Sequence, residues 1–289
     1  MTTITGHTKL YGLLGWPVGH TASPAMQNAA FAALQIDAAY VPLAVEPAKI
    51  GNAINSLITL GFAGANVTVP HKVEIMSFVD ELDEMARRIG AVNTLVFQEG
   101  RAKGYNTDAP GFAASLARRQ VAVQGRRVVL LGAGGAARAV AAGLAEAGAA
   151  SIAVAARRPE QADWLEAATG KQGRVVSLGA AAEAGALLEE CDLLVQCTSL
   201  GMAGKSLGQC PDISWERLKN DAVCCDIVYR PLQTAFLQEA ARRGHRTVTG
   251  EGMLAEQGAL AFELWTGQTA PREVFYAKLH DFLQESGPG

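Results

Sequence analysis

The chain has 289 residues, of which 49% are hydrophobic and 18% charged. This length allows two domains of ordinary size, and the composition is that of a compact folded protein rather than a disordered one. A formal net charge of −3 provides no basic field, which argues against nucleic acid as a partner.

Membrane and metal functions are also not indicated by the sequence. No apolar run reaches the roughly 20 residues that a membrane helix needs, and the first residues lack the form of a signal peptide. We therefore expect a cytoplasmic protein with a small-molecule substrate. The five cysteines are odd in number and show no metal-ligand spacing, so no metal site is predicted.

The first third of the chain alternates expected strands and helices. Strands are predicted at 10–15, 38–45, 64–69 and 91–97, helices at 25–34, 50–60 and 73–88, and a hairpin turn at 100–104. Ser23 followed by Pro24 fits the N-cap and first position of a helix. Because strands alternate with helices, the pattern predicts a mainly parallel sheet.

One stretch of this region, Asn66-Val67-Thr68-Val69-Pro70-His71-Lys72, carries polar groups at a strand end. Proline cannot donate to a sheet, so Pro70 marks the end of the strand. We interpret Lys72 as a catalytic base and Asn66 as a substrate ligand. His71 is interpreted as a residue that fills the turn.

The second half of the chain predicts another series of βαβ units. Strands are expected at 128–131, 152–156, 175–178, 192–197, 222–228 and 247–249, with helices at about 135–147 and 159–168 between them. A helix at 111–119 precedes this series, and two helices in 251–284 follow it. We expect the last two helices to pack on the first domain, because a lone pair cannot bury its apolar stripe.

A glycine-rich loop lies between the strand at 128–131 and the helix that follows. Gly132-x-Gly134-x-x-Ala137 has the form of a dinucleotide-binding fingerprint, and its strand-to-helix context makes it specific. Its glycines allow a pyrophosphate close to the backbone at a helix N-terminus. The predicted cofactor-binding residues here are Gly132, Ala133, Gly134, Gly135 and Ala136.

The next strand ends in Ala155-Ala156-Arg157-Arg158-Pro159, where an NAD site usually has Asp or Glu. Arg157 can pair with a 2′-phosphate and stack on adenine. This favours NADP, with NAD as the alternative cofactor. The alternative interpretation of both arginines is a solvated surface pair.

With these motifs in view, the chain resembles the shikimate and quinate dehydrogenase family over nearly its whole length. The similar segments are 66–72, Gly90-Ala91-Val92-Asn93-Thr94, Asn106-Thr107-Asp108, Thr198-Ser199-x-Gly201-Met202, Val228-Tyr229-x-Pro231 and Gly252-Met253-Leu254-x-x-Gln257. The resemblance implies an oxidoreductase that moves a hydride between a nicotinamide and a ring hydroxyl of a cyclohexene or cyclohexane carboxylate.

The resemblance also implies roles for particular residues. Lys72 would act with Asp108 at the reacting hydroxyl. The implied substrate ligands are Thr21, Ser23 and Tyr229 for the carboxylate, Asn66, Asn93 and Gln257 for the hydroxyls, and Thr68 within the first motif. Thr198 and Gly252 join the cofactor-binding residues.

The implied fold is α/β with two domains. Residues 1–110 plus 251–289 would form the substrate domain, and residues 111–250 a Rossmann-type dinucleotide-binding domain. A cleft with hinge motion is expected between them. Two alternative functions stay open: an NAD-linked enzyme that oxidises quinate or an amino analogue, and a nucleotide sensor without catalysis, against which Lys72 and Asp108 together argue.

Three positions depart from the pattern of the family. Thr21 stands where the family usually has serine, and Ala156 and Arg158 flank Arg157 where asparagine and threonine or serine are usual. An added methyl group in a pocket changes discrimination by only about 1–3 kcal/mol. The sequence therefore predicts the reaction type more strongly than the substrate or the cofactor.

Overall fold

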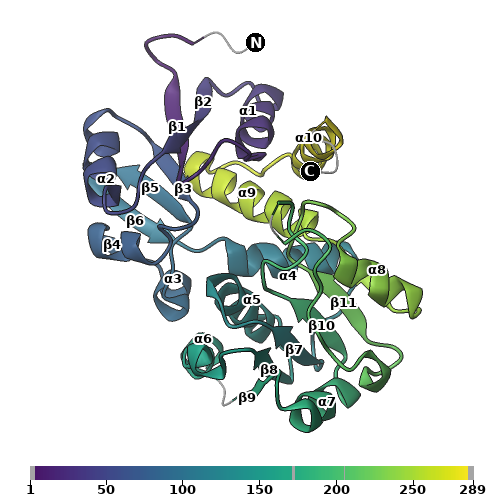
Figure 1. Ribbon diagram of the computed structural model, residues 1–289. Coiled ribbons are helices and arrows are strands. Elements are labelled where there is room, and N and C mark those ends of the chain that lie inside the picture. Colours follow the sequence, from purple (N-terminus) through teal and green to yellow (C-terminus); the bar gives the residue numbers. More distant parts are fainter. Residues whose placement is uncertain (1–3, 171–172, 205, 286–289) are drawn as a thin grey trace. The chain divides into compact units, whose positions relative to one another are not determined.

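The computed structural model describes residues 4–170, 173–204 and 206–285 of the chain (Figure 1). The described chain divides into two compact units. The first contains residues 4–107 and Ala255–Glu285, and the second contains Asp108–Leu254. Each unit is built around one sheet of six strands, and the fold is α/β with mainly parallel sheets, as predicted.

The sheet of the first unit has the strand order β2-β1-β3-β5-β6-β4. Its strands are β1 (Lys9–Gly15), β2 (Ala38–Ala44), β3 (Gly64–Val67), β4 (Glu81–Leu82), β5 (Thr94–Gln98) and β6 (Arg101–Tyr105). The pairs β1–β2, β1–β3 and β4–β6 are parallel, whereas β3–β5 and β5–β6 are antiparallel. Because β5 runs against β3, the start of β5 lies beside the end of β3.

The helices of the first unit cover this sheet. They are α1 (Ser23–Ala33), α2 (Ile50–Thr59), α3 (Glu84–Ile89), α9 (Glu251–Thr266, from Ala255 onward) and α10 (Arg272–Glu285). Trp265 of α9 donates its indole N–H to the Leu95 carbonyl at 2.9 Å, and its ring lies 4.9 Å from that of Tyr11. The packing predicted for the last two helices is confirmed by these contacts and by those between α10 and α1.

Two predicted elements of the first unit are wrong. Residues 73–88 do not form one helix but a 3₁₀ turn at Glu74–Phe78, then β4 and α3. Asp80 accepts a hydrogen bond from the Ala102 amide at 2.7 Å, and Asp83 caps α3 by accepting from the Ala86 amide at 2.8 Å. These bonds hold the chain extended between the two turns, because they compete with helical hydrogen bonds.

The predicted hairpin turn at 100–104 is also shorter than expected. Gln98 pairs with Arg101, so the turn consists of Glu99 and Gly100, both with positive φ. Positive φ at both central positions is typical of a type I′ turn, whose twist matches that of the flanking strands. The remaining residues of the predicted turn belong to β6.

The sheet of the second unit is wholly parallel, in the order β12-β11-β10-β7-β8-β9. Its strands are β7 (Arg127–Leu131), β8 (Ser151–Ala156), β9 (Arg174–Ser177), β10 (Leu193–Gln196), β11 (Val223–Asp226) and β12 (Arg246–Val248). The strand order reverses direction between β7 and β10. In doubly wound sheets, ligands bind outside the carboxyl ends of strands at such a switch point.

The helices of the second unit are α4 (Asp108–Arg118), α5 (Gly135–Glu146), α6 (Leu165–Thr169), α7 (Ala181–Glu189) and α8 (Ala235–Arg242). The predicted helix at 159–168 is a 3₁₀ turn at Pro159–Ala162 followed by α6. Gly143 of α5 lies against the backbone of Ala109 in α4, where a β-carbon would meet the Ala109 carbonyl carbon at 2.8 Å. The absence of a side chain therefore allows the two helices to pack closely.

The cysteines all lie in the second unit as free thiols. Cys191, Cys197, Cys224 and Cys225 are buried, and Cys210 is partly buried. Burial raises the pKa of Cys191 and of Cys224 to about 12. A thiol that remains protonated behaves as a small apolar side chain.

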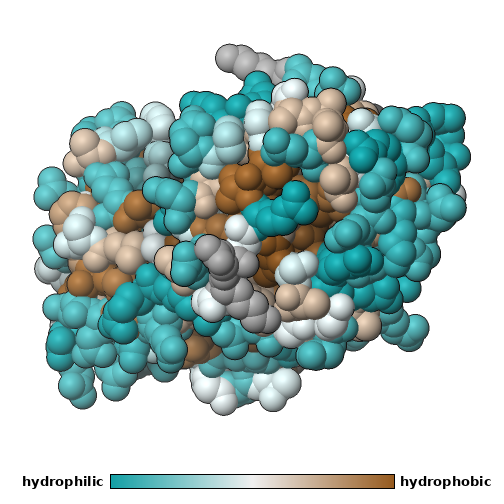
Figure 2. Space-filling view, turned by 90° about the horizontal axis from the view of Figure 1, so that it is seen from below, coloured by the Kyte–Doolittle hydropathy of each residue, from teal (hydrophilic) through white to brown (hydrophobic). Residues whose placement is uncertain are grey.

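Figure 2 shows one face of the molecule, where hydrophilic residues predominate and hydrophobic ones gather in patches between them. Within the described part of the chain, every helix is too short or too polar to cross a membrane.

Candidate active site

A cluster of buried amides and hydroxyls occupies the strand ends of the first unit. Asn93 precedes β5, and its amide nitrogen donates to the Thr107 hydroxyl at 2.9 Å and to the Gln257 side-chain oxygen at 3.4 Å. The Asn93 side-chain oxygen accepts from the Thr107 backbone N–H at 2.7 Å. The antiparallel β5 thus brings Asn93 beside the end of β3, and Gln257 of α9 contacts the same amide.

Asn66 on β3 belongs to this cluster and is only 5% exposed. Its amide nitrogen donates to the Asn93 carbonyl at 3.2 Å and to the Thr94 hydroxyl at 3.0 Å. Its side-chain oxygen accepts from the Tyr40 hydroxyl at 2.8 Å. The structure therefore brings together Asn66, Asn93 and Gln257, three of the residues predicted to bind substrate hydroxyls.

Thr21 and Ser23 form a hydroxyl pair at the start of α1. The Thr21 hydroxyl donates to that of Ser23 at 3.2 Å, and the Ser23 backbone N–H donates to the Thr21 hydroxyl at 3.2 Å. The prediction that Ser23 caps the helix is wrong, because Ala22 is the N-cap and no side chain caps this helix. Burial raises the pKa of Tyr40 and the nearby Ser23 hydroxyl lowers it in part, so Ser23 lies near Tyr40, which donates to Asn66 of the amide cluster.

The segment after β3 positions Lys72 through its backbone. The Lys72 carbonyl accepts from the Val92 N–H at 2.8 Å, which ties this turn to the segment that precedes β5. His71 is fully buried, and its Nε2 lies 2.7 Å from the Val45 carbonyl. This contact supports the interpretation of His71 as a residue that fills the turn.

Thr68 is partly buried, and its backbone N–H donates to the Leu14 carbonyl at 2.8 Å. A β-carbon at Gly15 would collide with the Thr68 methyl group, so β1 and this segment approach closely.

Asp108 follows Thr107 directly and is the first residue of α4, which begins three residues before the helix expected at Gly111. Its side chain is buried. Since the Thr107 amide and hydroxyl both contact Asn93, the backbone just before Asp108 is fixed at the amide cluster.

The glycine loop of the second unit has the features of a phosphate cradle. Gly132 has φ +107°, a conformation that side chains rarely adopt, and a β-carbon there would meet the Thr198 methyl group at 2.7 Å. Gly134 caps α5 with an extended backbone. Open space surrounds both Gly134 and Gly135, and these glycines are exposed together with Ala136.

These observations fit a dinucleotide. The first residues of α5, Gly135 and Ala136, are exposed, and a helix N-terminus attracts anions. The Ala133 carbonyl is held by the Trp164 indole N–H at 3.1 Å. Trp164 also packs under the Arg138 guanidinium, whose Cζ lies 5.7 Å from the ring centre, and burial lowers the pKa of Arg138. Sequence reasoning missed both of these residues.

Arg157 lies just after β8 and is exposed. Exposure leaves its guanidinium accessible to a phosphate, as the prediction of an NADP site requires. Exposure is equally compatible with the alternative, a solvated surface pair with Arg158. Gly252 is buried in the first turn of α9.

Asp226 connects the loop after β10, which carries Thr198, to the loop after β11, which carries Tyr229. Its carboxylate accepts from the Thr234 hydroxyl at 2.6 Å, the Val228 N–H at 2.9 Å and the Gln196 amide at 3.2 Å. Gln196 in turn accepts from the Thr198 N–H. Asp226 is 1% exposed, and burial raises its pKa to about 6 in opposition to these hydrogen bonds.

Tyr229 lies in the loop that follows Asp226. It is partly buried, and burial raises the pKa of its hydroxyl. The Ala203 N–H donates to the Arg230 carbonyl at 2.9 Å, which adds a second tie between the loops of Thr198 and Tyr229.

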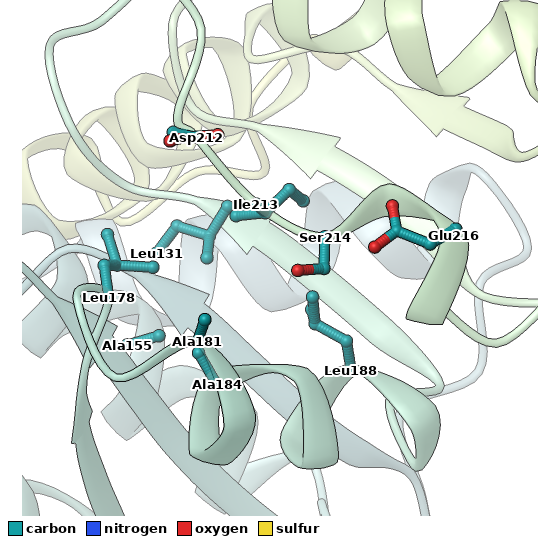
Figure 3. A pocket seen from close by; sticks show the side chains of 10 residues that line it. All are labelled: Leu131, Ala155, Leu178, Ala181, Ala184, Leu188, Asp212, Ile213, Ser214 and Glu216. Carbon is teal, nitrogen blue, oxygen red and sulfur yellow. The ribbon is translucent and has the colours of Figure 1, made fainter.

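A cavity of about 240 Å³ lies at the carboxyl ends of β7 and β8 (Figure 3). Its lining is mostly apolar: Leu131, Ala155, Leu178, Ala181, Ala184, Leu188 and Ile213, with Ser214. Asp212 and Glu216 lie at the two ends of the segment that borders it. Two carboxylates disfavour a phosphate here, whereas the open glycine loop suits one.

The described residues contain no group of three or more His, Cys, Asp or Glu side chains that could hold a metal ion. The wholly parallel sheet, its switch point and the glycine loop at the N-terminus of α5 define a protein of the Rossmann-type dinucleotide-binding class.

Comparison with known proteins specifies the family. Three family models match: the shikimate dehydrogenase substrate binding domain at residues 13–95, shikimate / quinate 5-dehydrogenase at 115–209, and the shikimate 5′-dehydrogenase C-terminal domain at 250–280. The chain is 44% identical over 282 residues to shikimate dehydrogenase (NADP(+)) of Desulforamulus reducens, covering 96% of each chain. The chain belongs to the shikimate dehydrogenase family.

Solved structures agree with this assignment. Shikimate 5-dehydrogenase from Thermus thermophilus, in complex with NADP(H) and shikimate, is 36% identical with a TM-score of 0.85, covering 96% of this chain and 100% of that one. Shikimate 5-dehydrogenase from Listeria monocytogenes, in complex with shikimate and NAD, is 30% identical with a TM-score of 0.90, covering 96% and 98%.

Proposed function

We propose that this protein is an NADP-dependent shikimate dehydrogenase, which interconverts 3-dehydroshikimate and NADPH with shikimate and NADP⁺. The observation that carries the proposal is a set of amides and hydroxyls, Asn66, Asn93, Gln257, Thr21 and Ser23, of which Asn66, Asn93 and Ser23 are buried, in a chain that also contains an open glycine loop. A polyhydroxylated ring with a carboxylate has the hydrogen-bonding groups that match such a set.

The proposed substrate domain is 1–110 plus 251–289, and the proposed dinucleotide-binding domain is 111–250. Asn66, Asn93 and Gln257 bind ring hydroxyls. Thr21, Ser23 and Tyr229 are the proposed ligands of the carboxylate. Thr68 follows Asn66 closely in the chain and completes the set of substrate ligands. Asn66, Asn93 and Ser23 are buried, so hydrogen bonds to the substrate replace those to water and reject analogues that lack the hydroxyls.

Lys72 and Asp108 carry out the proton transfer. Oxidation of a ring hydroxyl requires loss of its proton while hydride leaves the same carbon. Lys72 accepts this proton in that direction and returns it in the reducing direction, and the Asp108 carboxylate orients the ammonium group.

The glycine loop and Arg157 hold the dinucleotide. Gly132, Ala133, Gly134, Gly135 and Ala136 present backbone amides to the pyrophosphate, and Arg157 pairs with the 2′-phosphate. Thr198 and Gly252 complete the cofactor site. The bound nicotinamide supplies or accepts the hydride.

A substrate screen tests the proposal directly. Steady-state rates are measured for shikimate and quinate, each with NADP⁺ and with NAD⁺. The highest kcat/KM is expected for shikimate with NADP⁺. Negligible turnover of both carboxylates would refute the oxidoreductase proposal. A preference for quinate with NAD⁺ would establish the second candidate, which the similarity to quinate dehydrogenase from Corynebacterium glutamicum in complex with NAD, 28% identical with a TM-score of 0.85, favours.

Replacement of the proposed base separates an enzyme from a nucleotide sensor. Lys72→Ala is expected to lower kcat by about 10²–10⁴-fold, the usual contribution of a general acid–base group, while NADP⁺ affinity changes little. Lys49→Ala serves as the matched control, because Lys49 is exposed and pairs only with the exposed Glu46 among the ion pairs of the described chain. Turnover by Lys72→Ala within a few-fold of the wild type would exclude Lys72 as the base.

A further inference from the structure

Tyr40 lies between the two groups of residues that the proposed function assigns to the substrate. It is on β2, is only 2% exposed, and donates its hydroxyl to the Asn66 side-chain oxygen at 2.8 Å. The Ser23 side chain lies near the same hydroxyl. Its ring packs near Trp265, with the ring centres 6.0 Å apart, so the phenol has a fixed position.

The direction of these hydrogen bonds follows from the Asn93 carbonyl. A backbone carbonyl only accepts, so the group of Asn66 that faces it at 3.2 Å must be the amide nitrogen. The Asn66 oxygen therefore faces Tyr40, which must donate to it. Since the single Tyr40 proton is used in this way, the Tyr40 oxygen can only accept from its other neighbours.

The Thr21 hydroxyl donates to Ser23, and the Tyr40 hydroxyl donates to Asn66. Both protons of the Asn66 amide are already used, at the Asn93 carbonyl and the Thr94 hydroxyl. The Asn66 oxygen retains one lone pair, so Asn66 can only accept a hydrogen bond from a ligand.

Burial raises the pKa of Tyr40 far above the ordinary value for tyrosine, and the nearby Ser23 hydroxyl lowers it only in part. The hydroxyl therefore stays protonated and remains a donor at every working pH.

We propose that Tyr40 is a positioning residue that holds the Asn66 oxygen toward the substrate. The inference rests on the proposed function, in which Asn66 accepts from a ring hydroxyl and the Thr21–Ser23 pair binds the carboxylate. When a carboxylate binds, the Thr21 and Ser23 protons turn toward it, because a carboxylate is the stronger acceptor. The bond from Tyr40 to Asn66 is unaffected by that change.

Tyr40→Phe tests this role, since it keeps the ring and removes only the hydroxyl. We expect the KM for shikimate to rise about three- to tenfold, the effect of one lost hydrogen bond, with kcat and the KM for NADP⁺ within about twofold of the wild type. Tyr11→Phe is the matched control, because Tyr11 is 1% exposed and pairs in register with Tyr40 on the neighbouring strand. It should leave the KM unchanged.

A double-mutant cycle with Asn66→Ala shows whether Tyr40 acts through Asn66. In the Asn66→Ala background, Tyr40→Phe should have no further effect on the KM, because the group that it positions is gone. An additive effect, or a Tyr40→Phe KM within twofold of the wild type, would overturn the proposal. The wild-type rate with shikimate tests the proposed function separately, so the two failures are distinguishable.

Discussion

Asp226 provides a sharp test of how burial and hydrogen bonding combine in the second unit. Its carboxyl group is 1% exposed, and its pKa is raised from 3.8 to about 6. The folded protein therefore binds more protons than the unfolded chain between these two pH values. Stability falls as pH rises through this window, because the group must ionise in a buried position.

The magnitude follows from the shift. A change from 3.8 to about 6 corresponds to about 3 kcal/mol, at about 1.4 kcal/mol per pKa unit. Asp226→Asn keeps the shape of the side chain and cannot ionise. Its oxygen can still accept from Val228 and Gln196, and its new N–H group can donate to the Thr234 hydroxyl, which both donates and accepts.

The assay is urea denaturation of the wild type and Asp226→Asn from about pH 3 to pH 7, a range that spans both pKa values. The stability of the variant minus that of the wild type should increase with pH by up to about 3 kcal/mol and then level off above the folded pKa. A difference that stays constant across this range would refute the reasoning, whatever its absolute size.

Two further predictions concern packing and charge in the same unit. Gly143→Ala should lower stability by about 1–3 kcal/mol, because its β-carbon would strike the Ala109 backbone, while Gly179→Ala, with only an ordinary 3.5 Å contact, should change thermal unfolding little. An unchanged melting temperature for Gly143→Ala would mean that the helices move apart freely. Burial would raise the pKa of Asp192, but hydrogen bonds from Lys219 and the Arg127 backbone lower it to about 2. Asp192→Asn should therefore lower the free energy of unfolding by about 1–2 kcal/mol near neutral pH, and this loss should shrink as pH falls below about 4. Denaturation measured as a function of pH would detect the change. A loss of stability independent of pH would contradict the ion-pair explanation.

The elements that the sequence predicts well are those whose signal is local. The strand before Gly132 is a short apolar run that ends in a glycine turn, and β7 is Arg127–Leu131 as this pattern indicates. The strand order and the antiparallel course of β5 are not local properties. They depend on which apolar faces pack together, so the proximity of Asn66 and Asn93 follows only from the fold.

The failures have tertiary causes. The apolar spacing in 73–88 suits a helix, but Asp80 and Asp83 bind backbone amides of β6 and α3 and interrupt it. Helix α7 is not predicted because Ala181–Glu189 is rich in alanine and glycine and shows little apolar periodicity. The positions of the apolar residues in α7 are explained only by their packing against the face of the sheet.

The candidate site divides in the same way. Candidates such as Lys72, Asn66 and Gly132 lie in motifs and could be named from the sequence. Tyr40 is one polar position in an apolar strand, and nothing in the sequence of Ala38–Ala44 indicates a role for its hydroxyl in the site. Its contact with Asn66, 26 residues away, is visible only in three dimensions.

The reactivity of the buried thiols indicates how often the core of the second unit opens. Burial raises the pKa of Cys191 and Cys224 and keeps both thiols out of contact with solvent, so alkylating reagents reach them only when the core opens. Both lie in the core of the second unit, packed with Trp215 and Phe236. The rate at which they react therefore measures how often this core is exposed to solvent, without any label introduced from outside.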